Sequence, residues 1–237
     1  KYNSVQVKSG LDEEALGGAI YNAADMSIAS STFTGNYTKD GKGGAIYNSA
    51  DSKSLELTKV TFTGNYALYG NAIYNDGTIN KISSTFKSNV INNPNAQGGA
   101  IYNNALIDSI ESSTFANNQS NYGGAIYNSE NGTINRLFKI TAGNAKNNKS
   151  QNIATYGGAI YNAGTISEIS SSTLSRNNAT ASGAAIYNTG IISKITSTAM
   201  SNEVSATNGG AIYNAGTIES IDRKSTISNN KSTNGNG

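Results

Sequence analysis

The stretch Gly43-Gly44-Ala45-Ile46-Tyr47-Asn48 decides the fold, because the chain contains almost the same six residues eight times. The steps between successive copies are 26, 27, 28, 25, 34, 26 and 26 residues. Self-similarity at a period of this size indicates a solenoid, in which each repeat forms one coil and stacks on the next. A solenoid presents long faces, so we expect a scaffold or a binding surface. The copies begin at Gly17, Gly43, Gly70, Gly98, Gly123, Gly157, Gly183 and Gly209.

Two further motifs recur between the copies, and both are typical of strands. A Gly-Thr-Ile segment is followed by a second aliphatic residue three positions after the Ile, and a Thr-Phe segment by an Asn three positions after the Phe. Their apolar clusters are short, rich in β-formers, and lack a helical period. The Phe–Asn pairs are Phe33–Asn36, Phe62–Asn65, Phe86–Asn89 and Phe115–Asn118, and Leu174, Ala199 and Ile227 then replace Phe before Asn177, Asn202 and Asn230.

Three strands and three corners in about 26 residues make one rung of a parallel β-helix. Gly and Asn at the breaks supply corners with positive φ, and crossovers between parallel strands are almost always right-handed. We therefore predict an all-β, right-handed, single-stranded parallel β-helix of about eight rungs with three short strands each. Residues 1–16 are expected to be a run-in or partial rung, and residues 17–237 one domain excerpted from a longer array. In the longest step, the polar stretch 142–156 is predicted to be a loop between rungs five and six.

Stacking places each residue above its equivalent in the rung below. The Ile of each six-residue motif is predicted to form one internal stripe, and the recurring Phe residues another. The Asn that closes the motif is invariant in all eight copies, and in stacked β arrays such a ladder lets each amide bond to the next. The predicted structural Asn ladder consists of Asn22, Asn48, Asn75, Asn103, Asn128, Asn162, Asn188 and Asn214.

The Tyr between this Ile and Asn is the candidate binding residue. Adjacent strand residues point to opposite faces, so an inward Ile implies an outward Tyr. A continuous aromatic stripe suits sugar rings or protein partners, because Tyr combines an apolar face with a polar tip. The alternative is a purely structural ladder, stacked on itself or covered by a neighbouring loop. The stripe consists of Tyr21, Tyr47, Tyr74, Tyr102, Tyr127, Tyr161, Tyr187 and Tyr213.

Composition excludes several functions. Charged residues make up 14% of the chain and the net charge is +2, a balance that does not favour nucleic acid as a partner. The absence of Cys and His removes the thiolate and imidazole ligands and the usual general base. No window approaches 18 apolar residues, so we expect no direct membrane insertion by this segment. We therefore expect no metal and no cofactor.

The paired Phe-x-x-Asn and Gly-Gly-Ala-Ile motifs carry a family resemblance. Phe33-Thr-Gly-Asn36 with Gly43-Gly-Ala-Ile46, and Phe115-Ala-Asn-Asn118 with Gly123-Gly-Ala-Ile126, resemble the repeats of chlamydial-type polymorphic membrane proteins and related autotransporter passengers. The similarity extends over about residues 17–230. It implies an extracellular bacterial surface protein of the type V secretion class, anchored to the outer membrane through a region outside this chain. Such passengers often act as adhesins, so the implied partners are a host-cell receptor, a glycan or another copy of the chain.

Two other function classes stay open at this point. Parallel β-helices include polysaccharide lyases and glycosidases, and a glycosidase needs two carboxylates facing each other about 5–10 Å apart. Asp76, Asp108, Glu130, Glu168 and Glu219 fall at differing offsets of different rungs, and nothing singles out a pair, so we predict that the chain is not an enzyme. The second alternative is a structural or self-associating spacer, since a bare solenoid end exposes strand edges.

Overall fold

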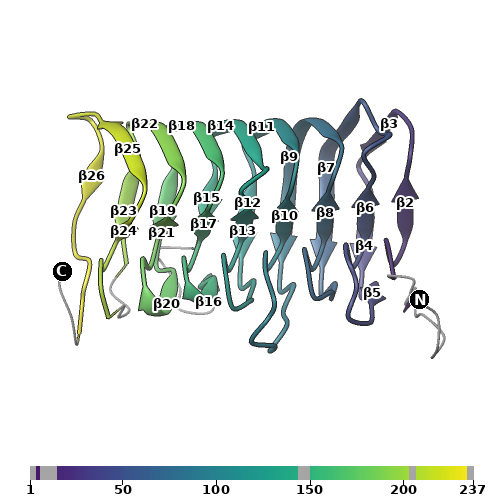
Figure 1. Cartoon of the computed structure of the whole chain (residues 1–237), viewed down its shortest axis with the longest axis horizontal. Coiled ribbons are helices and arrows are strands. Elements are labelled where there is room, and N and C mark those ends of the chain that lie inside the picture. Colours follow the sequence, from purple (N-terminus) through teal and green to yellow (C-terminus); the bar gives the residue numbers. More distant parts are fainter. Residues whose placement is uncertain (1–3, 6–14, 144–149, 203–206, 234–237) are drawn as a thin grey trace.

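The chain is a rod of stacked coils in the computed structural model, which describes residues 4–5, 15–143, 150–202 and 207–233. Every strand pair in these ranges is parallel, and the ranges contain no α-helix. Figure 1 shows the strands crossing the long axis one above another, with the chain ends near opposite ends of the rod. The prediction of an all-β parallel β-solenoid is thus confirmed, with about seven turns between the first and last copies of the motif.

One sheet is built entirely from the repeated Ile-Tyr-Asn segments. Its eight strands pair in chain order, and Ile lies beside Ile, Tyr beside Tyr and Asn beside Asn at each step. Each strand is only three residues long because a Gly precedes it with a positive φ. At Gly43 φ is +66°, and a Cβ there would lie 2.2 Å from the carbonyl oxygen of Ile46. The strands are β2 (Ile20–Asn22), β6 (Ile46–Asn48), β8 (Ile73–Asn75), β10 (Ile101–Asn103), β13 (Ile126–Asn128), β17 (Ile160–Asn162), β21 (Ile186–Asn188) and β24 (Ile212–Asn214).

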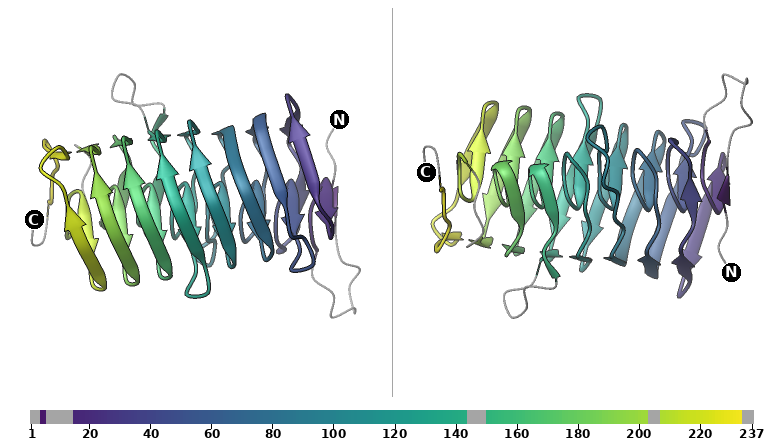
Figure 2. Two further views of the ribbon diagram at one scale, coloured as in Figure 1. Left: turned by 90° about the horizontal axis from the view of Figure 1, so that it is seen from above. Right: turned by 90° about the horizontal axis from the view of Figure 1, so that it is seen from below.

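The second and third strand positions of the rungs join one fourteen-stranded sheet. The second positions are β3 (Met26–Ala29), β11 (Leu106–Glu111), β14 (Thr133–Phe138), β18 (Thr165–Ser170), β22 (Ile191–Thr196) and β25 (Thr217–Ile221). The third are β4 (Thr32–Thr34), β12 (Thr114–Ala116), β15 (Thr141–Ala142), β19 (Thr173–Ser175), β23 (Ala199–Ser201) and β26 (Thr226–Ile227). Two long strands, β7 (Leu55–Thr63) and β9 (Thr78–Lys87), each span both positions. In the left view of Figure 2, from above, the strands of the second position lie side by side along the rod.

The fusion in β9 departs from the prediction of three short strands per rung. Most rungs turn the second corner on a residue with positive φ, such as Ser112 at 48° and Ser171 at 50°. The third rung has one residue fewer between Ile82 and Thr85, and no residue there has positive φ. In the second rung β7 is also continuous, although it keeps a corner residue, Lys59, with φ at 57°. β7 pairs with β9 over both positions, and the register between them shifts at this corner.

Two small sheets lie on the third edge of the rod, where the chain returns to the next motif. They pair β1 (Ser4–Val5) with β5 (Tyr37–Thr38), and β16 (Ile153–Tyr156) with β20 (Asn178–Ser182). The prediction of a loop over 142–156 is therefore wrong at both ends, because Thr141–Ala142 and Ile153–Tyr156 are strands. Residues 144–149 lie outside the described part of the chain.

The core is a set of columns that run along the rod. The Phe column stacks face to face, with ring centroids 5.1, 4.9 and 4.9 Å apart, and Phe62, Phe86 and Phe115 are fully buried. Farther along, Ala142, Leu174, Met200 and Ile227 take the same position. The assignment of Ala199 to this column is wrong by one residue: Ala199 pairs with Thr173 and is exposed, while Met200 is buried.

An Asn ladder closes the first corner. Within the seven steps from Asn22 to Asn214, each side-chain Nδ2 donates to Oδ1 of the Asn in the next rung at 2.7–2.8 Å. The same Nδ2 also reaches backbone carbonyls: that of Asn103 donates to the oxygens of Ala105 at 3.0 Å and Thr133 at 3.2 Å. The six interior members are fully buried, so these bonds satisfy amides that water does not reach.

A second Asn ladder, which sequence reasoning did not assign, closes the third corner. It uses the Asn of the Phe-x-x-Asn motif, with Asn152 as the fifth-rung member, and its amides bond rung to rung at 2.9–3.3 Å. Most members also donate Nδ2 to the carbonyl at the Phe position one rung back, as Asn118 does to Phe86 at 3.1 Å. The sequence does carry a signal for this ladder, because the Asn of the Phe-x-x-Asn motif is kept in the later rungs where Phe is replaced. Its members are Asn36, Asn65, Asn89, Asn118, Asn152, Asn177, Asn202 and Asn230.

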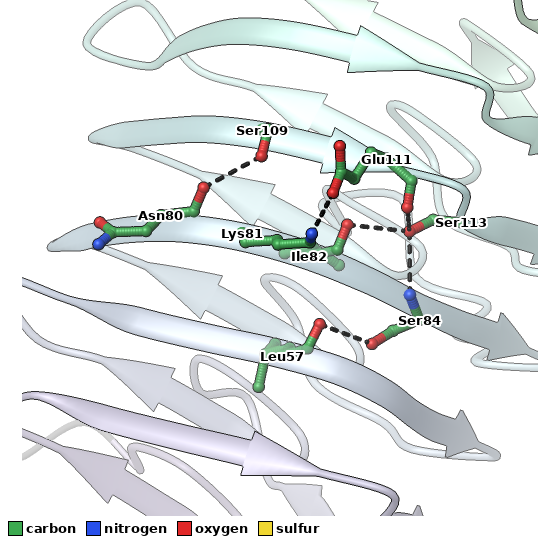
Figure 3. Close-up of polar contacts among 8 residues, drawn as sticks. All are labelled: Leu57, Asn80, Lys81, Ile82, Ser84, Ser109, Glu111 and Ser113. Carbon is green, nitrogen blue, oxygen red and sulfur yellow. Dashed lines mark hydrogen bonds and ion pairs between the residues drawn. The ribbon is translucent and has the colours of Figure 1, made fainter.

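At the second corner, hydroxyl side chains form the hydrogen bonds between successive rungs (Figure 3). Ser84 Oγ donates to the carbonyl of Leu57 at 3.3 Å, and Ser113 Oγ accepts from the backbone N–H of Ser84 at 3.0 Å. On the outer face of the same strands, Lys81 forms an ion pair with Glu111. Each corner of the rung is thus held by side chains that bond along the rod.

Candidate functional site

The tyrosine stripe, defined by the eight Tyr residues of the Ile-Tyr-Asn strands, runs the length of the smaller sheet. Neighbouring rings are stacked, with centroids 4.6–5.5 Å apart and interplanar angles of 9–25°. Strand alternation sets this geometry, because the flanking Ile and Asn side chains point into the core. Offset stacking of this kind adds about 0.5–1.5 kcal/mol per pair beyond the burial of area.

The exposure of the stripe varies along the rod. Tyr21 is 54% exposed, whereas Tyr47 and Tyr74 are only 9% and 5% exposed. These two side chains are therefore covered, whereas Tyr21 is open to solvent. The Tyr47 hydroxyl donates to Asp76 Oδ2 at 2.6 Å, and the Lys42 ammonium lies 5.2 Å from the centroid of the Tyr74 ring. The remaining members, Tyr102, Tyr127, Tyr161, Tyr187 and Tyr213, are half-buried and keep accessible edges.

A second set of tyrosines, which sequence reasoning missed, borders the stripe. Tyr69, Tyr122 and Tyr156 occupy the position before the first Gly of the six-residue motif and lie in register through Gln97. Each ring makes an edge-to-face contact with a tyrosine of the stripe one rung onward. The ring centroids are 5.7 Å apart for Tyr69 with Tyr102, 5.6 Å for Tyr122 with Tyr161 and 5.3 Å for Tyr156 with Tyr187. The signal in the sequence was a Tyr before this Gly in three copies. These flanking tyrosines widen the aromatic surface over the rungs where the stripe is half-buried.

A polar row borders the other side of the stripe, at the position just after each Asn of the first ladder. Asn104 donates to Asp76 Oδ1 at 2.8 Å and accepts from Ser129 Oγ at 2.7 Å. This row also contacts the phenols, since Tyr102 bonds with Ser129 and Tyr161 with Thr189. The hydroxyl tips of the stripe are thus oriented by the next rung.

Burial raises the pKa values of four members of the stripe. It raises the pKa of Tyr102 to about 12 and raises the pKa values of Tyr127, Tyr161 and Tyr187 as well. The cause is desolvation of the phenolate first, with neighbouring tyrosines and carboxylates adding to it. Near neutral pH these four phenols are therefore protonated and present uncharged hydroxyls.

The carboxylates weighed for catalysis are dispersed. Asp76 belongs to the polar row, and Glu168 lies on the fourteen-stranded sheet, with Oε2 3.7 Å from Arg136 Nε. Asp108 accepts a hydrogen bond from Asn135 at 2.9 Å. Within the described ranges, no group of three or more His, Cys, Asp or Glu residues could hold a metal ion.

These features define a class of protein, a parallel β-solenoid with ladder-closed corners and an aromatic face. The family model of the Chlamydia polymorphic membrane protein repeat matches the chain at residues 30–49 and 112–129. The chain therefore carries repeats of this type at two places, and each match runs from the third strand position of one rung into the next Ile-Tyr-Asn strand. This repeat family is not an enzyme family.

Comparisons with curated proteins and with solved structures identify no relative of the chain, since no curated protein and no solved structure is similar enough to it to count as a match. In the part of the chain that the structure describes, no helix has the length and apolar character needed to cross a membrane.

Proposed function

We propose that this chain is a surface-exposed passenger segment that acts as a rigid stalk and adhesive face. The repeat match and the solenoid fold fit a surface passenger-like protein, and the family name suggests a cell-surface or outer-membrane location. The observation that carries the adhesive role is the tyrosine stripe over rungs four to eight, where Tyr102, Tyr127, Tyr161, Tyr187 and Tyr213 are half-buried. Repeated equivalent contacts along one face add through multivalency.

The exposed groups of the tyrosine stripe indicate what kind of partner it would bind. Rings with accessible edges and neutral hydroxyl tips pack against the apolar faces of sugars or against protein side chains, so the partner is a glycan or a protein on a host or neighbouring cell. Interface tyrosines often carry most of the binding energy, because they are large and lose little conformational freedom. The two Asn ladders and the hydroxyl side chains of the second corner hold the rungs in place. They pre-organise the tyrosine rings, which lowers the entropic cost of binding.

The test is attachment of beads coated with the full chain to cultured animal cells. The double variant Tyr161→Ser/Tyr187→Ser removes the middle of the accessible stripe and should reduce attachment about tenfold. The matched control, Leu106→Ser/Ile191→Ser, removes apolar residues that are 37% and 43% exposed on the other sheet, and should leave attachment unchanged. Equal attachment of wild type and the Tyr double variant would remove the stripe from the proposal.

A further inference from the structure

A hollow lies beside the longest of the described connections between a Phe-x-x-Asn motif and the next Gly. Its volume is about 330 Å³, near the lower end of ligand-binding cavities. Its lining includes residues of β16 and β20, and none of its lining residues belongs to the tyrosine stripe. Figure 1 shows where these two strands lie on the rod. The floor of the hollow is the short connection that begins at Gln119, and its walls come from the loop at 91–94, from Ile153–Thr155 and from Thr180.

Differences in connection length create this hollow. The chain takes eight residues, 90–97, to pass from Asn89 to Gly98, but only four residues, 119–122 and 153–156, in the equivalent connections of the next two rungs. The longer connection therefore projects beyond its neighbours and overhangs the floor. Such an overhang on a rigid scaffold is a common location for binding residues.

Hydrogen bonds fix the overhang to the floor. Asn121 Nδ2 donates to the carbonyl of Pro94 at 2.5 Å, and its Oδ1 accepts from the hydroxyl of Thr155. The backbone N–H of Asn95 donates to Asn93 Oδ1 at 2.9 Å, which closes the tip of the loop. The backbone N–H of Ile91 donates to the carbonyl of Gln119 at 3.2 Å. Both walls are thus tied to the floor, and the hollow is pre-formed.

Several polar groups on the lining remain available to a ligand. Within the described ranges, the side chains of Asn92, Gln119 and Thr180 make no hydrogen bond to the protein. An amide presents both donors and an acceptor, and a hydroxyl presents one of each kind. Apolar surface from Pro94 and Ile153 lies beside them. None of the lining residues is ionisable, so nothing in the hollow favours a phosphate, a carboxylate or an ammonium group.

We propose that this hollow binds one neutral pyranose unit of a saccharide. A pyranose carries hydroxyls that both donate and accept, which match the amides of Asn92 and Gln119 and the hydroxyl of Thr180. Its C–H face matches the apolar side chains of Pro94 and Ile153. Asn121 acts as a positioning residue that holds the overhang in place. This site goes beyond the adhesive stripe and uses different residues.

The experiment is saturation-transfer difference NMR on the full chain with a panel of methyl pyranosides. The panel includes neutral hexosides and N-acetylhexosaminides, together with a glucuronide and a sialoside as acidic members. The test variant is Gln119→Leu/Thr180→Val, which removes the free amide and hydroxyl while keeping side-chain size and the backbone bonds. The control is Gln97→Leu, the same substitution at a connection residue that does not line the hollow.

We expect at least one neutral pyranoside to bind wild type and the Gln97→Leu variant equally, and to bind the double variant about tenfold more weakly. Circular dichroism establishes that each variant is folded, and Thr180→Val alone, at an exposed residue, provides a second measurement if the double variant fails to fold. The proposal is overturned if no neutral pyranoside binds, if the acidic members bind equally well, or if the folded variants bind as wild type does. The Tyr161→Ser/Tyr187→Ser variant should bind the pyranoside normally, which separates this outcome from that of the stripe.

Discussion

Replacing one interior Asn of the first ladder should destabilise the rod far more than replacing the last one. Asn103 is fully buried, donates to Asn128 Oδ1 at 2.8 Å and accepts from Asn75 Nδ2 at 2.8 Å. Asn103→Ala removes both ladder bonds and leaves the Asn128 oxygen without its donor. A typical hydrogen bond contributes about 0.5–1.5 kcal/mol, and an orphaned buried group costs about 1–3 kcal/mol. Together they give a loss of about 3 kcal/mol in the free energy of unfolding.

The assay is urea unfolding of the full chain followed by far-ultraviolet circular dichroism. With a slope of about 2–3 kcal/mol per molar urea, this loss lowers the midpoint by on the order of 1 M. The matched control is Asn214→Ala, because Asn214 is exposed and accepts one ladder bond, from Asn188 at 2.7 Å. Its expected cost is under about 1 kcal/mol. Midpoints that agree for the two variants would refute the idea that the ladder holds successive rungs together.

Three further outcomes follow from the geometry. Phe86→Ala should lower the free energy of unfolding by about 3–5 kcal/mol, because this ring is fully buried between two stacked neighbours. Phe138 is partly exposed, so Phe138→Ala should lower it by under about 1 kcal/mol in the same urea assay. The fold raises the pKa of Tyr102 to about 12, so the stability that this residue contributes is complete below its unfolded pKa of about 10 and is lost as pH rises from there through about 12. An absorbance titration of tyrosinate should show a group of tyrosines that ionises only at high pH, as the circular dichroism signal is lost. Ionisation of all tyrosines together near pH 10, with the fold intact, would contradict this. Ser112 has φ at 48°, a conformation that a β-branched residue adopts with strain and that Gly adopts freely. Ser112→Val should therefore lower the free energy of unfolding by about 1–2 kcal/mol, and Ser112→Gly should leave it unchanged or raise it. Equal urea midpoints for these two variants would contradict a positive φ at this corner.

The repeat pattern predicts most of the fold, because stacking turns a one-dimensional period into a three-dimensional register. Once the motif at Gly43 and its copies define the rung, the Ile stripe and the first Asn ladder follow from the alternation of side chains. The Phe column was misplaced by one residue at Ala199, because the spacing from the buried residue to the following Asn shortens from three residues to two at Met200 and Asn202. The continuity of β7 and β9 across the second corner was not predictable from length, because β9 has one residue fewer there whereas β7 keeps the usual number.

The candidate site was less predictable, since exposure depends on residues from other rungs. Alternation correctly excludes the tyrosines from the inner columns, but the cover over Tyr74 comes from Lys42, which belongs to a corner in the preceding rung. The flanking contact of Tyr122 with Tyr161 likewise joins residues of two rungs. The hollow beside Gln119 arises from a difference between connection lengths, and no single motif encodes it.

The first Asn ladder has a direction, and this direction sets how the protein can change length. Every amide nitrogen points toward the following coil and every amide oxygen toward the preceding one, so any coil fits onto any other in the same orientation. Removal of residues 46–72 would join Ala45 to Ile73, restore the six-residue motif and bring Asn22 beside Asn75. Recombination between copies of such a gene segment would therefore shorten or extend the molecule by whole coils, and its length could evolve without redesign of its core.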